Sequence, residues 1–335
     1  GVADVTATPA PGAGAPGTDS QGAPARPARP VRLGYGTNGL ADHRVDDALA
    51  MLADLGYDGV ALTLDVRHLD PFADDVHAAT QAVARRLDRL GLGVVVETGA
   101  RYLLDPRLKH EPTLVSAQGV ERRVDLLQRA VRIAADLGAD AVSCWSGVLA
   151  PGLDPDAARR QVADALAQVL EEADRLDVPL AVEPEPGHLV ERLDDVLDLR
   201  RVLGQPERLR VTLDLGHCVC VEDEPVADVV RRAGDLLVDV QVDDMVRGVH
   251  EHLPLGEGAL DLRSALAALV ETGFTGLAAV ELPRHSHAGP DMAARSIASL
   301  EEALAALPAA GAPGTDGAAD RAVDLSGRER TGAVV

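Results

Sequence analysis

Lysine is almost absent from this sequence, and basic residues as a class are outnumbered. The 335 residues include 54 Asp and Glu against 32 Lys and Arg, which gives a formal net charge of −22, and Lys109 is the single lysine. A long-range field of that sign repels polyanions, so we expect no nucleic-acid partner. Aromatic residues make up only 2% of the chain; together with the excess of alanine this indicates a compositional habit, from which no function follows.

Cysteine and long apolar runs are sparse as well. Cys144, Cys218 and Cys220 are an odd number at spacings that fit neither a disulfide framework nor a zinc ribbon, which favours a reducing compartment. No segment approaches the roughly 20 continuous apolar residues of a membrane span, and the amino terminus lacks a basic-then-apolar signal pattern. We therefore expect a cytoplasmic protein with no membrane partner.

The two ends of the chain differ from its middle. Residues 1–30 are dominated by Ala, Pro and Gly and contain almost no large apolar side chains, and residues 307–335 repeat this character. Such segments cannot offset the entropy of ordering, so we predict a disordered N-terminal tail and a flexible C-terminal tail. Residues 31–306 remain as one domain, which is long and apolar enough to bury a full core.

That domain alternates strand-like and helix-like patterns. The expected strands are residues 31–36, 58–65, 91–98, 139–146, 178–185, 209–216, 235–244 and 275–282. The expected helices are residues 45–55, 76–90, 120–137, 157–176, 193–203, 226–233, 260–270 and 292–304. Gly91 and Gly138 stand where a left-handed C-cap would end a helix. Eight such units favour a closed (β/α)8 TIM barrel, and the lack of G-x-G-x-x-G after the first strand disfavours a dinucleotide-binding sheet.

Potential metal ligands follow successive strands in the second half of the chain. They are Glu183 in LAVEPEPGH, Asp214 and His217 in LDLGH, His250 and His252 in HEHLPLGEG, and Glu281 in LAAVEL. The carboxyl ends of barrel strands share one mouth, so one ion can reach all four segments. A carboxylate at a buried strand end is costly without a positive partner. For Glu183 that partner is either a metal ion or an arginine from elsewhere.

Each of these signals has a plainer alternative. Asp214 could cap the next turn, with His217 bonded to backbone, although carboxylate oxygen and imidazole nitrogen together suit Mn²⁺, Mg²⁺, Co²⁺ or Zn²⁺. His250 and His252 could be surface groups, but alternate residues of extended backbone point the same way. The glycines of the LGEG segment that follows indicate a fixed loop shape.

Further residues are candidates for contacting substrate. Glu185 and His188 follow the fifth strand, Glu97 closes the third, and Lys109 lies in the long loop after it. Loops of that length often wall a substrate site, though an ordinary surface excursion is the alternative. Arg284, after the eighth strand, either binds an anion through its guanidinium fork or pairs with a neighbouring carboxylate. A substrate phosphate, if there is one, would be received by Lys109, Arg247 or Arg284.

The ligand series resembles the xylose-isomerase-like TIM barrel superfamily over about residues 31–304. In its epimerase branch, the resemblance implies ligands at Glu183, Asp214, position 241 and Glu281. Position 241 is Gln241 rather than the usual His. The amide oxygen of Gln ligates more weakly than imidazole, so His217 or a loop histidine is an alternative ligand.

The AP endonuclease branch of the same superfamily is matched in part. Its D-x-x-H motif corresponds to Asp214 and His217, but in its D-x-H loop motif only His252 is retained and His250 stands in place of the Asp. Asp65 and Glu97 stand at the second and third strand ends, where that branch would have histidines.

The leading hypothesis is a divalent-metal-dependent isomerase or epimerase of a small sugar or polyhydroxy carbonyl compound. The metal (Mn²⁺, Mg²⁺ or Co²⁺, with Zn²⁺ as an alternative) would chelate adjacent carbonyl and hydroxyl oxygens and stabilise an ene-diolate, while Glu183 and Glu281 act as base and acid. A dehydratase of the inosose-dehydratase type, a phosphodiesterase of the AP-endonuclease type, and a non-catalytic metabolite-binding barrel are the alternatives. The expected partner is a sugar or polyol, and a homo-oligomer is left open.

Overall fold

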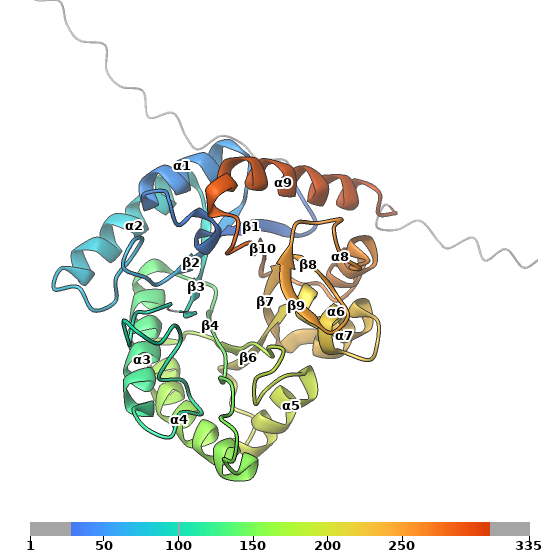
Figure 1. Ribbon diagram of the computed structural model, residues 1–335. Helices are drawn as coiled ribbons and strands as arrows, with labels where there is room; N and C mark the ends of the chain where they lie inside the picture. The colour runs from blue at the N-terminus through green and yellow to red at the C-terminus, as the bar shows by residue number, and fades with distance from the viewer. Residues whose placement is uncertain (1–27, 100, 309–335) are drawn as a thin grey trace, which may run out of the picture.

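The structure is a computed structural model that describes residues 28–99 and 101–308 (Figure 1). The predicted tails, residues 1–30 and 307–335, lie outside the described residues except for their inner ends. At the first of these ends, Arg29 donates a hydrogen bond to the carbonyl of Gly56 at 2.8 Å and pairs with Asp58 at 3.0 Å. Arg29 therefore packs on the body of the protein rather than belonging to the tail.

Eight parallel strands close into a barrel in the order β1, β10, β7, β6, β5, β4, β3, β2. Their bounds are Arg32–Gly36 (β1), Gly59–Thr63 (β2), Gly93–Glu97 (β3), Val142–Cys144 (β4), Leu180–Val182 (β5), Leu209–Asp214 (β6), Leu237–Val242 (β7) and Leu277–Val280 (β10). The strands are almost entirely buried because helices cover their outer faces. The predicted (β/α)8 barrel is confirmed.

The helices form the outer ring seen in Figure 1. Their bounds are Val45–Asp54 (α1), Val76–Leu90 (α2), Val120–Leu137 (α3), Pro155–Leu176 (α4), Leu193–Val202 (α5), Leu215–Val221 (α6), Val226–Ala233 (α7), Leu262–Glu271 (α8) and Gly289–Ala305 (α9), with short 3₁₀ turns at Thr37–Leu40, Gly234–Leu236 and Ser286–Ala288. Gly91 and Gly138 cap α2 and α3 at φ of 62° and 65°, as predicted. None of the helices among the described residues is long and apolar enough to cross a membrane.

Two elements near the mouth were not predicted. The seventh strand, predicted at residues 235–244, ends at Val242, and the chain then forms an antiparallel hairpin of β8 (Asp244–Val246) and β9 (Val249–Leu253). Helix α6 starts directly after β6, where the predicted strand continued to residue 216. Figure 1 shows the hairpin beside α6, on the inner side of the helical ring. These insertions cover one side of the barrel mouth.

The barrel interior is apolar at its floor and polar above it. Leu277 fills the floor so tightly that a side-chain carbon on Gly34 or Gly59 would overlap it. Ala61, Val95 and Ala279 complete this small interior cluster. The ionisable side chains described below stand on this apolar floor, which excludes water from beneath the site.

Candidate metal centre and substrate cavity

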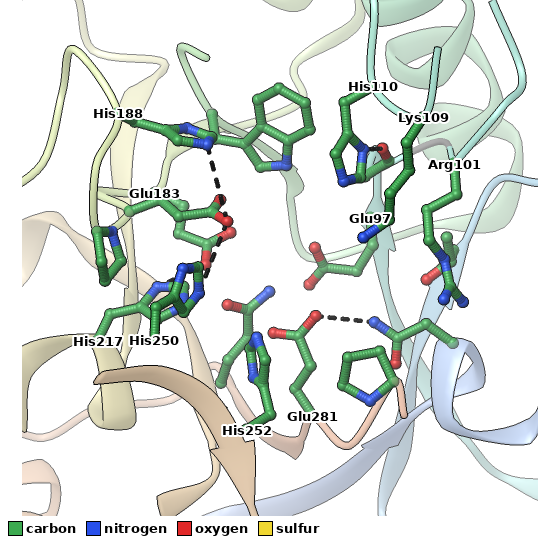
Figure 2. Close-up of a pocket in the computed structure, with 18 of the residues that line it drawn as sticks. Glu97, Arg101, Lys109, His110, Glu183, His188, His217, His250, His252 and Glu281 are labelled. Carbon is green, nitrogen blue, oxygen red and sulfur yellow. Dashed lines mark hydrogen bonds and ion pairs between the residues drawn. The ribbon is translucent and has the colours of Figure 1, made fainter. Parts of the chain in front are cut away.

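A cavity of about 340 Å³ opens at the carboxyl ends of the strands (Figure 2). Apart from the phosphate candidate Arg247, the sequence nominated twelve residues as ligands, catalysts or substrate contacts, and eleven of them line this cavity: Glu97, Lys109, Glu183, Glu185, His188, His217, Gln241, His250, His252, Glu281 and Arg284. The twelfth, Asp214, is 1% exposed and contacts two of the histidines from below the lining. Residues spread over nearly 190 positions of sequence, from 97 to 284, thus surround one space.

One group of candidate ligands comes from the ends of β5 and β6. Glu183, Asp214 and His217 are all buried and place one ligand atom each within 4.8 Å of the others. The Nδ1 atom of His217 lies 3.2 Å from the Glu183 carboxylate, and its Nε2 atom lies 3.6 Å from Asp214. No arginine pairs with Glu183 in the described part of the chain, so the alternative of a structural arginine partner has no support.

Asp214 takes the capping role and keeps its second oxygen available for the other role considered for it. Its Oδ1 atom accepts a hydrogen bond from the backbone N–H of His217 at 2.9 Å and so caps α6. Its Oδ2 atom is buried without a hydrogen-bond partner. Gly216, between the two motif residues, is needed for a reason other than the turn: a Cβ there would overlap the Asp243 carboxylate.

A second group forms where the hairpin meets the barrel. His252, on β9, joins Asp214 and Glu281 with ligand atoms within 4.8 Å of one another. The Nδ1 atom of His252 contacts Asp243 at the end of β7, which leaves Nε2 as its remaining ligand atom. Glu281 is oriented from the other side, because the Asn38 amide donates a hydrogen bond to it at 2.8 Å.

Three histidines form a third group that overlaps the other two. His217, His250 and His252 again place ligand atoms within 4.8 Å of one another, and the Nε2 atoms of His217 and His250 are 3.1 Å apart. The shape of the loop after β9 is fixed by Asp244, whose carboxylate accepts hydrogen bonds from the backbone N–H groups of Gly256 and Leu260 at 2.9 and 2.8 Å. The LGEG segment is therefore anchored, as its glycines indicated.

Gln241 stands in β7 at the level of Asp214, with which it is in register. Its Oε1 atom is buried without a partner, and so is Oε1 of Glu97. Unsatisfied buried acceptors are rare in proteins, because each costs about 1–3 kcal/mol. Together with the free oxygen of Asp214, these atoms and the neighbouring imidazoles form a mixed oxygen and nitrogen donor set that fits a divalent ion such as Mn²⁺ or Zn²⁺.

The electrostatics of the cavity agree with that requirement. Burial, with Glu185 and Glu281 nearby, raises the pKa of Glu183 well above its usual range, and burial with Asp239 and Glu281 does the same for Glu97. Burial also raises the pKa of Glu185 to about 7. Acidic groups gathered this closely repel one another unless a cation lies between them, so the chain's own charges favour binding one.

The pKa values of the histidines shift the other way. Burial, with the charge of His217 next, lowers the pKa of His250 to about 4 and that of His188 to about 3. Both are therefore neutral near pH 7, which is the protonation state in which imidazole ligates a metal or accepts a hydrogen bond.

The remaining wall is aromatic on one side and cationic on the other. Trp145 packs edge to face between His110 and His188, with ring centroids 5.4 and 5.1 Å away. Arg101, Lys109 and Arg284 contribute positive charge. Arg247, which the sequence offered as a phosphate contact, is absent from the lining and pairs with Asp223 at 2.7 Å, so that interpretation is wrong.

Comparison with known proteins decides the family. The sequence model described as xylose isomerase-like TIM barrel matches residues 49–303, about three quarters of the chain. This chain belongs to that family. Among curated proteins it is 26% identical over 249 residues to the L-ribulose-5-phosphate 3-epimerase UlaE of Salmonella paratyphi C, covering 70% of this chain and 81% of the relative.

Solved structures show the same barrel at lower identity. A D-allulose 3-epimerase from Methylomonas sp. in complex with D-allulose superposes with a TM-score of 0.64 at 19% identity, covering 83% of this chain and 98% of the other. The IOLI protein, with a bound zinc atom, superposes with a TM-score of 0.66 at 14% identity, covering 82% and 98%.

Several residues of this xylose isomerase-like site were missed from the sequence. Asn38, which orients Glu281, follows the first strand as part of a short TNGL turn without a charge to mark it. Asp243 could have been found, because VDD places acids at the end of a buried strand just as Glu183 does. Arg101 gave no signal, since one arginine in a long loop is ordinary.

Proposed function

We propose that this chain is a divalent-metal-dependent epimerase or isomerase of a small ketose. The observation that carries the proposal is a pair of potential metal-binding groups that share the buried Asp214, with unsatisfied ligand atoms between them. The two groups are Glu183–Asp214–His217 and Asp214–His252–Glu281. Such a centre is costly to maintain unless a cation and a polar substrate use it. A bound divalent ion would polarise the substrate carbonyl and stabilise negative charge on adjacent oxygens.

The protein's own groups supply the proton transfers. Glu183 follows β5 and Glu281 follows β10, and β6 and β7 separate those two strands in the barrel. The two carboxyl groups therefore approach the cavity from different sides. One can remove the proton from the carbon next to the carbonyl while the other returns a proton to the opposite face, which inverts the centre. Asn38 holds Glu281 in place, and His217 does so for Glu183.

The relatives support a ketose as the substrate class. UlaE is named for L-ribulose 5-phosphate, and the Methylomonas enzyme was solved with D-allulose. Both compounds carry a hydroxyl-bearing carbon beside a ketone, which is the unit that a metal and two carboxyl groups can act on. The alternative of a dehydratase needs the same proton abstraction, and differs in that a hydroxyl leaves from the neighbouring carbon.

A second candidate, metal-dependent phosphodiester hydrolysis, is favoured by one observation. The groups Glu183–Asp214–His217 and His217–His250–His252 overlap but are distinct, so the centre offers donors for more than one ion. The metal content of purified protein separates the two functions. Several zinc ions per chain would favour hydrolysis, and a single ion with proton exchange at carbon would favour epimerisation.

The decisive experiment is deuterium exchange. The metal-loaded protein is incubated in D₂O with a panel of ketoses and ketose phosphates, and nuclear magnetic resonance follows deuterium at the carbon beside the carbonyl together with the appearance of the epimer. Glu183→Gln should abolish exchange without unfolding the protein. Glu171→Gln, on the exposed face of α4, is the matched control and should exchange at the wild-type rate. Loss of water without epimer formation would instead assign a dehydratase.

A further inference from the structure

We infer that Arg101, Lys109 and Arg284 form an anion subsite that receives a phosphate monoester at the end of the substrate remote from the metal centre. The inference rests on the proposed function, because it assigns the second functional group of the same substrate. Its test does not depend on the metal ligands.

The three cations come from two separate loops. Arg101 and Lys109 belong to the long segment between β3 and α3, and Arg284 follows β10. All three line the cavity. Burial lowers the pKa of Lys109, the positive charges of Arg101 and Arg284 lower it further, and the carboxylate of Glu185 opposes them in part, so both arginines act on the lysine.

Carboxylates line the same cavity, and Glu185 acts on Lys109 at longer range, but none pairs directly with this group in the described part of the chain. Among the described residues, none of the three side chains has a hydrogen bond or an ion pair, whereas Arg231 pairs with two carboxylates and so does Arg29. In a chain with a net charge of −22, acidic partners are abundant. All three side chains are exposed to solvent at the cavity, and their unpaired positive charges are available to an anionic ligand.

The loop that carries two of the cations is held in place. The guanidinium of Arg123 is buried and donates hydrogen bonds to the carbonyl groups of His110 and Pro112 at 2.6 and 2.9 Å. The backbone N–H of Tyr102 donates to the carbonyl of Lys109 at 2.7 Å, so the segment folds back on itself. The backbone of the segment that carries Arg101 and Lys109 is therefore held in place before any ligand arrives.

The cations also lie on the correct side of the cavity. Figure 2 shows Arg101 and Lys109 on the side opposite His217 and His250. A substrate that places its carbonyl and hydroxyl oxygens at the metal centre must direct its far end toward these cations. The cavity thus has two poles, one that attracts a cation and one that attracts an anion.

The charge of the subsite fits a phosphate better than a carboxylate. A phosphate monoester carries about −1.5 to −2 charge at pH 7 and offers three acceptor oxygens. Two guanidinium forks and one ammonium can each donate to a separate oxygen. A sugar acid would bring a single negative charge and would leave the group with excess positive charge.

The test measures binding of inorganic phosphate to the full chain after divalent ions have been removed with a chelator, so that no metal can hold the anion. Calorimetry should show saturable binding that weakens as salt is raised. Lys109→Met and Arg284→Gln should each weaken it about tenfold or more, the loss expected for one charge-assisted hydrogen bond. Arg107→Gln is the matched control, since Arg107 is exposed on the same segment and does not line the cavity; it should leave binding unchanged.

Three outcomes would overturn the inference: no saturable phosphate binding, equal losses in Arg107→Gln and Lys109→Met, or acetate bound more tightly than phosphate. The assay involves no turnover, so its failure is separate from failure of the proposed function. Proton exchange with free ketoses, together with absent phosphate binding, would leave the epimerase proposal standing and remove the subsite. Phosphate binding without any exchange would do the reverse.

Discussion

Replacing His252 by alanine should sharply weaken metal binding, although this residue lies on a hairpin outside the barrel. His252 groups with Asp214 and Glu281, close to the level in the barrel at which Gln241 stands on β7. We expect the histidine to substitute for the weaker amide ligand. Its ring is held by Asp243, which contacts Nδ1, and the same Nδ1 atom lies 3.9 Å from Oδ2 of Asp214.

The size of the effect can be bounded from these contacts. Removing an outer partner of a metal-bound histidine costs about 10–100-fold in affinity, or about 1.4–2.7 kcal/mol. Asp243→Asn should fall in that range. His252→Ala removes the ligand atom itself, so it should cost about 100-fold or more. His77→Ala, an exposed histidine paired with Asp136, is the control and should bind metal normally.

Competition titration with Mn²⁺ or Zn²⁺ measures each affinity, and a thermal melt of the metal-free protein checks folding. The double variant Gln241→His/His252→Ala tests whether metal binding can be rescued. Gln241 is in register with Asp214, and its Oε1 atom is buried without a hydrogen-bond partner. The double variant should bind the metal at least tenfold more tightly than His252→Ala alone, since imidazole is the better ligand. An unchanged affinity in His252→Ala would refute the reasoning, as the hairpin would then be a bystander.

Three further predictions concern the scaffold and its protons. Gly216→Ala should lower the free energy of unfolding by about 1–3 kcal/mol through overlap with the Asp243 carboxylate, and an unchanged urea midpoint would contradict this. Asp244→Ala should speed hydrogen exchange at the backbone amides of Gly256 and Leu260, which donate hydrogen bonds to this carboxylate, and should lower the free energy of unfolding by about 3 kcal/mol. Unaltered exchange would show that Asp244 does not hold the loop. In metal-free protein, Glu185 has a pKa of about 7 against an ordinary 4.5, so the folded state keeps a proton that the unfolded state releases, and stability should fall as pH rises from about 4.5 to 7. Glu185→Gln should make the melting temperature depend less on pH over this range. His250→Gln should have the opposite effect and make the fall steeper. A histidine whose folded pKa is about 4 contributes stability above pH 6.5 that is lost on acidification, so its removal takes away a contribution that rises with pH.

The architecture was readable from sequence because it repeats. Each unit carries a short apolar run, an amphipathic stretch and a glycine stop, and the local signals agree with one another over eight units. The errors fall where the repeat is interrupted. The fourth strand, predicted at residues 139–146, covers only Val142–Cys144, because the bonding of its end is taken over by side chains such as Ser146. The β8–β9 hairpin reads VHEHL, whose polar character resembles a loop.

The site was less readable, since ligand geometry depends on contacts between distant segments. Strand-end acids could be located by register alone, because parallel strands of a barrel end at one rim. The entry of His252 into the centre depends instead on a reversal of the chain at Gly248 and on the contact with Asp243. Neither follows from spacing. The family resemblance led us to expect a histidine at position 241. Here the strand carries Gln241, and we expect His252, from another segment, to provide the imidazole.

Asp214 shows that one side chain can have a structural role and a functional role at the same time. A carboxylate has two oxygens, and a strand-to-helix junction consumes one of them in capping α6. The hydrogen bond fixes the plane of the group, so the second oxygen is directed at the cavity side without freedom to turn away. That oxygen is buried without a hydrogen bond, with imidazole nitrogens of His217 and His252 at 3.6 and 3.9 Å, and a cation bound among them would stabilise its charge. The cap is therefore what orients the ligand, and a substitution such as Asp214→Asn should weaken metal binding far more than it weakens the helix.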